Sequence, residues 1–189
     1  MNAGEATKRR LLDAATAEFA TYGIAGARVD RISAQARANK AQLYAYFGNK
    51  EGLFDAVFGE HLDMIVNTVP LNAEDLPGYA TGLYDAYLVH PELVRLATWS
   101  RLERVPAGEL ITNLPGHDTL KLESISAAQR AGLVHPALAP TDVLTLVTAM
   151  SLAWSPASVT IAATKDDAED EHERRRKALH ETVRRAFAP

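Results

Sequence analysis

The chain has 189 residues, which is enough for one large domain or two small ones. Hydrophobic residues make up 47% of it and charged residues 23%, a composition typical of a folded globular protein and not of a disordered one. It contains no cysteine, which excludes disulfides, thiolate metal sites and cysteine nucleophiles.

The formal net charge of −4 is distributed unevenly along the chain. Residues 1–50 contain eight Lys or Arg and four Asp or Glu, whereas residues 51–189 contain twelve and twenty. A basic head on an acidic body indicates that only the head meets a polyanion. Chance variation in surface charge explains the same pattern equally well, so the charges alone decide nothing.

The N-terminus is polar, with three basic residues at positions 8–10 and no apolar run after them. A signal peptide is therefore not expected. No stretch reaches the roughly 18 apolar residues that a bilayer-spanning helix needs. These observations predict a cytoplasmic protein without a membrane partner.

Apolar residues at helical spacing predict an all-α chain of about nine helices, and no segment shows the sustained alternation of a strand. The first helix covers about residues 5–22, where Leu11, Leu12, Ala15 and Phe19 form one stripe, and Gly23 ends it. The second covers about residues 28–36.

The third helix covers about residues 40–47 and has a clear start signal. Asn39 is suited to its N-cap, and Gln42 stands three residues later at the spacing of a capping box. A turn at Gly48 separates it from a longer fourth helix, at about residues 50–66.

Five further helices are expected in the remainder. Prolines punctuate it, and Gly132 is placed to stop the seventh helix. The eighth could continue past Pro156 with a kink. The five segments are about residues 77–89, 91–104, 118–131, 141–154 and 167–187.

Three short helices at the N-terminus, two of them joined by a tight turn, favour a DNA-binding helix-turn-helix. The segment Arg28–Phe54 resembles the signature of the tetracycline-repressor (TetR) family of transcriptional regulators. Ile32 and Ala36 lie on that pattern. So do Leu43, Tyr44, Phe47, Lys50, Glu51, Leu53 and Phe54.

The resemblance covers about the first 55 residues. It implies an N-terminal DNA-binding domain at residues 1–49 and a helical ligand-binding and dimerisation domain at residues 50–189. One departure lies in the turn between the second and third helices, where the family usually has glycine and this chain has Arg37. A non-glycine residue with positive φ costs roughly 1 kcal/mol or more. Either Arg37 is strained or the turn differs.

In this kind of motif the first turns of the third helix point at base edges. Lys40 could donate to guanine or to a phosphate, and Ala41 could touch a thymine methyl or allow close approach. Gln42 could pair bidentately with adenine. Its alternative role is the capping-box partner of Asn39.

Phosphate contacts are expected from other side chains. The resemblance implies one for Tyr44, whereas Tyr46 either contacts phosphate or packs against the first helix. Lys50 begins the fourth helix, where free backbone N–H groups also favour phosphate, and its alternative is a solvated lysine. Arg28 is a further candidate, and solvation is the better interpretation of Arg37.

The body is expected to bind an effector and a second copy of the chain. Aromatic side chains offer flat surface for an apolar or aromatic ligand, although plain core packing explains them too. The ligand-site candidates are Tyr84, Tyr87, Trp99, Met150 and Trp154.

Residues 143–154 are apolar around most of the helix, which requires burial on more than one side. The resemblance implies that the last two helices pair across a two-fold axis, and burial within one chain is the alternative. The interface candidates are Leu146, Met150, Leu179, Val183 and Phe187.

The resulting expectation is a homodimeric regulator that represses transcription from a palindromic DNA operator. A small apolar or aromatic effector is expected to release it from that operator. No cofactor or metal site is expected, and the scattered histidines make an enzyme the weakest alternative. A ligand-independent or architectural DNA binder and a partner-protein module remain open.

Overall fold

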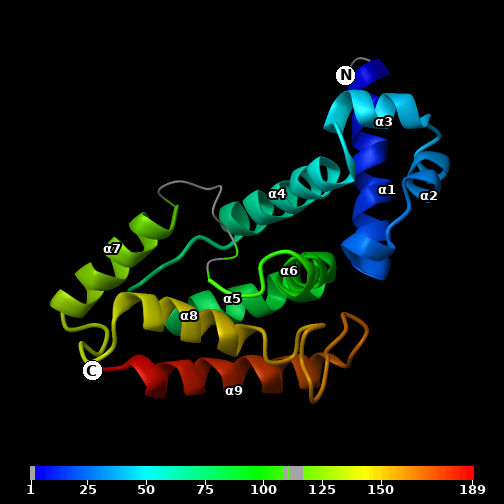
Figure 1. The fold of residues 1–189 in the computed structure, drawn as a ribbon. Helices are drawn as coiled ribbons and strands as arrows, with labels where there is room; N and C mark the ends of the chain where they lie inside the picture. Colours follow the sequence, from blue (N-terminus) through cyan, green and yellow to red (C-terminus); the bar gives the residue numbers. More distant parts are fainter. Residues whose placement is uncertain (1–2, 109, 111–116) are drawn as a thin grey trace. The chain divides into compact units, whose positions relative to one another are not determined.

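The computed structural model describes residues 3–108, 110 and 117–189 (Figure 1). Over these residues the chain forms nine helices and no strand, which confirms the predicted fold class. It divides into two compact units, one of residues 1–64 and 92–110 and the other of residues 65–91 and 111–189.

The first unit contains α1 (Ala3–Gly26), α2 (Val29–Gln35), α3 (Lys40–Phe47), most of α4 (Lys50–Thr68) and α6 (Pro91–Glu103). Helices α1, α2 and α3 contact one another pairwise. Their shared core also takes in α4 and α6, through the edge of Phe19 against Phe54 at 5.3 Å and through fully buried Leu96. The expected apolar stripe of α1 faces this core.

Helix α1 is kinked near its end because Gly23 has φ 72° and ψ −178°, a region that only glycine adopts readily. The sequence predicted the interruption at this residue. Helical turns resume and continue to Gly26, beyond which the chain enters α2.

Helix α2 ends with Arg37 in the left-handed conformation, at φ 51°. The Arg37 N–H donates to Ala34 O (3.2 Å) and the Ala38 N–H to Ser33 O (3.0 Å). These two bonds form a Schellman motif, in which glycine is the usual residue at the left-handed position. The strained alternative expected for Arg37 is therefore the one that the structure adopts.

The second unit contains α5 (Leu76–Val89), α7 (His117–Arg130), α8 (Pro140–Ser151) and α9 (Glu169–Phe187). Helix α5 packs against α8 and α9, and α7 packs against α8 (Figure 1). The side chains buried in this unit include Leu83, Val143, Val147, Leu179 and Val183.

Helix α8 ends at Ser151 and does not continue past Pro156, so that expectation was wrong. A proline lacks an N–H, its ring clashes with the carbonyl four residues earlier, and it disfavours helical dihedrals in the residue before it. The chain instead folds back through turns, and the Ala163 N–H donates to Trp154 O at 2.7 Å.

Candidate functional site

Helix α3 packs on the first unit's core through Leu43 and Phe47 and leaves most of its remaining surface exposed. Leu43 is fully buried, whereas Lys40, Ala41, Gln42, Tyr44 and Tyr46 are all exposed. The predicted base- and phosphate-contacting residues of α3 are therefore all accessible from outside the unit.

The N-terminus of α3 is held by the capping box that the sequence indicated. The Gln42 N–H donates to Asn39 Oδ1 (2.8 Å), and the Asn39 N–H donates to Gln42 Oε1 (3.1 Å). Pairing with adenine needs the oxygen and the nitrogen of a glutamine amide together. Because its oxygen is turned back to accept from the Asn39 N–H, a bidentate contact with adenine requires Gln42 to share or give up that bond.

Lys40 is also engaged within the unit. Its Nζ lies 2.6 Å from Asp30 Oδ1 on α2, and this hydrogen bond raises the pKa of Lys40. Both side chains are more than half exposed, so the pair is solvated and exchanges readily for another anion. Lys40 is therefore positioned beside α2 but remains available to a phosphate.

The two tyrosines of α3 differ in their surroundings. The Tyr46 hydroxyl donates to Gly4 O on α1 at 3.1 Å, which is the packing alternative considered for it. Tyr44 is 46% exposed and its hydroxyl makes no hydrogen bond within the described residues. Of the pair, Tyr44 is the one free to donate to a phosphate.

Two further predicted phosphate ligands lie at helix starts: Lys50 is the first residue of α4 and Arg28 is the N-cap of α2. Lys50 Nζ donates to Ala25 O (3.3 Å) and Ala27 O (3.4 Å), so its ammonium ties α4 to the end of α1 and to the residue that follows α1. The Arg28 side chain is exposed and has no partner among the described residues. Arg28 thus keeps its full capacity for phosphate.

Glu18 is a positioning residue that the sequence reasoning missed. It is 5% exposed, and its Oε1 accepts from the Arg28 N–H (2.8 Å) and from Arg31 Nε (2.8 Å). The carboxylate fixes the start of α2 against α1, since Arg28 as N-cap makes no side-chain capping bond. The available signal was an acidic residue within the apolar stripe, three positions after Ala15.

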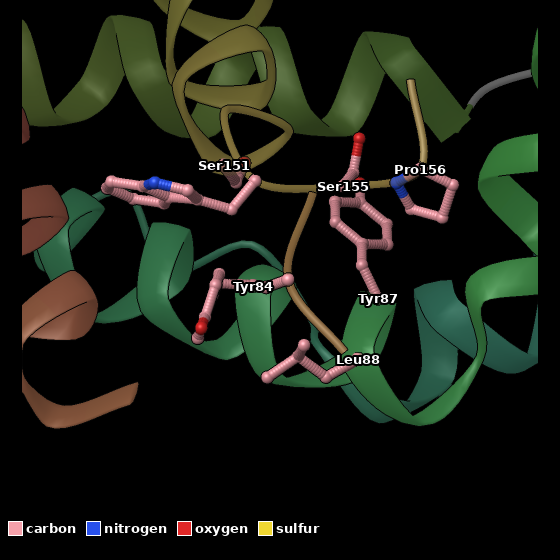
Figure 2. A pocket seen from close by; sticks show the side chains of 8 residues that line it. Tyr84, Tyr87, Leu88, Ser151, Ser155 and Pro156 are labelled. Carbon is pink, nitrogen blue, oxygen red and sulfur yellow. The ribbon is translucent and has the colours of Figure 1, made fainter. Parts of the chain in front are cut away.

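The second unit contains a small pocket between α5 and the segment that follows α8 (Figure 2). Its volume of about 10 Å³ is room for about one water molecule. Three predicted aromatic residues line it, but Met150 and Trp99 do not. The lining residues are Tyr84, Tyr87, Leu88, Ser151, Trp154, Ser155, Pro156 and Ala163.

Aromatic packing and buried polar contacts define the wall formed by Tyr84. Its ring meets Trp154 edge-on, with centroids 6.0 Å apart. Its hydroxyl lies 2.7 Å from Nδ1 of His172 on α9, and both residues are buried. Burial also raises the pKa of Tyr87. The pocket thus combines flat apolar surface with hydroxyl groups.

Trp99 belongs to the first unit. Its indole packs against the core there, and a Cβ added at Gly23 would lie 2.9 Å from Trp99 Cε3. Trp99 therefore serves the interior of that unit in this structure.

Two family models match the chain. Residues 11–57 match the model of bacterial regulatory proteins of the tetR family, and residues 75–185 match the tetracyclin repressor-like C-terminal domain. The second match alone covers more than half of the chain. The chain belongs to the TetR family.

Named relatives agree with this assignment. The HTH-type transcriptional repressor SCO4008 of Streptomyces coelicolor is 40% identical over 153 residues, which are 78% of this chain and 77% of that protein. The HTH-type transcriptional repressor NicS of Pseudomonas putida is 32% identical over 106 residues, covering 52% of this chain and 50% of its own.

Solved structures show the same fold. The transcriptional regulator SCO4942 of Streptomyces coelicolor superimposes with a TM-score of 0.80 at 37% identity, over 96% of this chain and 98% of its own. AibR, solved with isovaleryl coenzyme A and operator DNA, has a TM-score of 0.67 at 17% identity over 94% and 97% of the two chains.

As a TetR-family member, the protein is a non-enzymatic DNA-binding regulator that acts as a homodimer and responds to a small molecule. Among the described residues, no helix is both long and apolar enough to cross a bilayer.

The predicted dimer residues fall into two groups. Leu179, Val183 and Phe187 of α9 are buried within the single chain, at 3%, 0% and 3% exposure. Leu146 of α8 is 41% exposed and Met150 is partly exposed. An apolar strip of α8 thus remains available to a second subunit, while the three α9 residues fill their own unit's core.

Proposed function

We propose that this TetR-family regulator is a repressor that binds a palindromic operator through the exposed surface of α3 and leaves it when a small apolar or aromatic effector binds. The observation that carries the proposal is the open N-terminal turn of α3, fixed by its capping box and anchored by Leu43. Because a transcriptional regulator must reach the chromosome, we place it in the bacterial cytoplasm.

Each proposed DNA contact uses a group of the side chain that has no partner within the unit or has one that exchanges readily. Ala41 allows close approach to a base edge, and Lys40 exchanges its surface partner Asp30 for phosphate or guanine. Tyr44 and Arg28 supply phosphate contacts from unpaired polar groups. Gln42 donates through its amide nitrogen while its oxygen keeps the cap.

Tyr46 and Lys50 act more by holding the helices than by touching DNA. The bond from Tyr46 to Gly4 O ties α3 to α1, and the bonds from Lys50 reach the carbonyls on either side of Gly26. A contact with phosphate would require either side chain to give up these bonds.

Selection from a random DNA library by the full-length protein, at two salt concentrations, tests the DNA-binding step. An enriched palindrome whose affinity falls steeply with salt is the expected result. Tyr44→Phe should then weaken binding, whereas Tyr22→Phe, which changes a similarly exposed tyrosine of α1, should not. No enrichment at either salt, or equal losses in the two variants, would count against the proposed surface.

The effector site is proposed at the pocket of Tyr84, Tyr87 and Trp154. A cavity of about 10 Å³ cannot hold a molecule larger than water, so an effector must displace the segment at residues 152–163. The bond from the Ala163 N–H to Trp154 O closes that segment and is the contact that binding would break.

Coupling between effector and operator in this way is typically worth roughly 1–3 kcal/mol, or a 5–150-fold loss of DNA affinity. A thermal-shift screen of small aromatic compounds tests the site, since a ligand that binds only the folded state raises the melting temperature. A hit should lose its effect in Tyr87→Leu. A hit that stabilises this variant as well as the wild type would place the site elsewhere.

The dimer interface is proposed on the exposed strip of α8 that contains Leu146 and Met150. Leu146→Glu places a charge on that strip and should yield monomers in light scattering. Leu120→Glu, at a leucine of α7 that is 67% exposed, is the matched control and should stay dimeric. A dimeric Leu146→Glu variant would exclude this strip.

A further inference from the structure

Arg37 is an unusual residue in the DNA-binding unit, because its backbone is strained and its side chain is unused. Its φ of 51° lies in the left-handed region, where the other positive-φ positions of the described chain are all glycines. A strained backbone residue at the edge of a binding surface is a reason to look for a function of its side chain.

Local structure does not need the Arg37 guanidinium. Backbone N–H groups bond the carbonyls of Ser33 and Ala34 in the Schellman motif, and Arg10 Nε donates to Ala36 O at 3.0 Å. The cap of α2 is therefore built from backbone groups and from another arginine. Glycine at this position would keep the same two backbone bonds and remove the strain.

The Arg37 side chain is exposed and makes no hydrogen bond or ion pair with any described residue. Two other cations nearby differ in this respect, because Lys40 pairs with Asp30 and Lys50 is bonded to two carbonyls. Arg37 stands two residues before Asn39, the N-cap of the exposed helix α3. It is an unpaired positive charge at the entrance to that helix.

We propose that Arg37 contacts a DNA phosphate beside the groove that α3 enters, and that this contact offsets its backbone strain. The inference rests on the proposed function of α3. A guanidinium binds phosphate oxygens bidentately and keeps its charge at any working pH. One such contact per subunit adds affinity without adding sequence preference.

The contact has a measurable salt signature. Each neutralised phosphate contributes about 0.9 to the slope of log affinity against log salt concentration. A dimer makes two such contacts. Between 50 and 200 mM salt, the DNA affinity of the wild type should therefore fall about twelvefold more than that of a variant that lacks them.

Two substitutions in the full-length protein separate the charge from the strain. Arg37→Gln keeps a non-glycine residue in the strained backbone conformation but removes the charge. The salt slope should therefore fall by nearly two while the melting temperature stays near that of the wild type. Arg37→Gly removes both, so the slope should fall equally and the melting temperature should rise by about 2–4 °C.

Two matched controls come from the second unit. Arg130→Gln removes an exposed arginine from the end of α7 and should leave the salt slope unchanged. Gly132 ends α7 with the same pair of Schellman bonds at φ 72°, so Gly132→Arg measures the backbone cost of arginine in that motif. It should lower the melting temperature and leave DNA affinity as it is.

The outcomes are distinct. If the wild type binds its selected palindrome and both Arg37 variants keep its affinity and salt slope, Arg37 is only a strained turn residue and the inference is overturned. If the wild type binds no DNA at any salt concentration, the proposed function fails and takes this inference with it.

Discussion

Gly23→Ala is expected to destabilise the first unit strongly. The glycine has φ 72° and ψ −178°, and residues other than glycine are strained there by about 1–3 kcal/mol. The added Cβ would also lie 2.5 Å from Glu103 Oε1 and 2.9 Å from Trp99 Cε3. Both penalties arise inside one unit.

The contact with Trp99 is harder to relieve than the one with Glu103, because the indole packs against the core of the unit. The exposed Glu103 carboxylate can move aside, although its Oε2 then loses the bond from the Ala25 N–H at 2.6 Å. Forcing extra atoms into packed regions costs about 1–3 kcal/mol. Together with the backbone strain, we expect a loss of about 2–6 kcal/mol, a large part of the about 5–15 kcal/mol that holds a typical domain folded.

Chemical denaturation of the full-length protein measures this loss, and Gly132→Ala supplies the control. Gly132 has the same φ of 72°, but a Cβ there would meet nothing within 4 Å. It should cost only about 1–2 kcal/mol from the backbone. A Gly23→Ala variant no less stable than Gly132→Ala would show that neither Trp99 nor Glu103 lies over Gly23 as described.

Two further predictions concern buried polar groups of the second unit. Tyr84→Phe removes the hydroxyl bonded to His172 and should lower the free energy of unfolding by about 1–3 kcal/mol in thermal denaturation. Tyr87→Phe is the control and should be about as stable as the wild type. Equal losses of stability in the two variants would contradict the special role of that bond. Asp167→Asn removes the nearer of the two carboxylates beside the buried guanidinium of Arg175, the other being Glu171 at 3.8 Å, and should lower the melting temperature. The hydrogen bond from Arg175 lowers the pKa of Asp167, so this pair stabilises the fold fully above about pH 4 and progressively less as the pH falls through the lowered pKa. The melting temperatures of wild type and Asn variant should therefore converge in acid, and a constant gap down to pH 2 would refute the ion pair.

Features encoded by neighbouring residues were predictable from the sequence. The predicted bounds of the third helix agree with α3, because Asn39 and Gln42 mark its start and Gly48 its end within a few positions. The stop at Gly132 likewise follows from short-range turn chemistry, whereas the sequence left a strained Arg37 and a different turn as alternatives. Such signals need no knowledge of tertiary structure.

Features that depend on distant partners were not predictable. The turn segment after α8 is closed by the hydrogen bond from the Ala163 N–H to Trp154 O. No residue pattern around Ser151 predicts this bond. Lys50 matches a family motif, but its bonds to carbonyls 23 and 25 residues earlier emerge only in the folded unit. The role of Glu18 has the same origin, since its partners come from the next helix.

The hydrogen bonds and ion pairs that the α3 side chains already make indicate how the protein would discriminate between DNA sequences. A base contact through both amide atoms of Gln42 would weaken or break the bond from the Asn39 N–H to Gln42 Oε1, whereas Lys40 exchanges one solvated anion for another at little cost. We therefore expect direct hydrogen-bonded readout to be weak, with Ala41 offering only an apolar contact suited to a thymine methyl. We therefore expect the selected operator to show a few strongly preferred positions under α3 and a larger share of affinity from phosphate contacts and DNA shape. A selected palindrome in which Gln42→Ala relaxes an adenine preference would show instead that the cap opens on binding and that the amide reads the base.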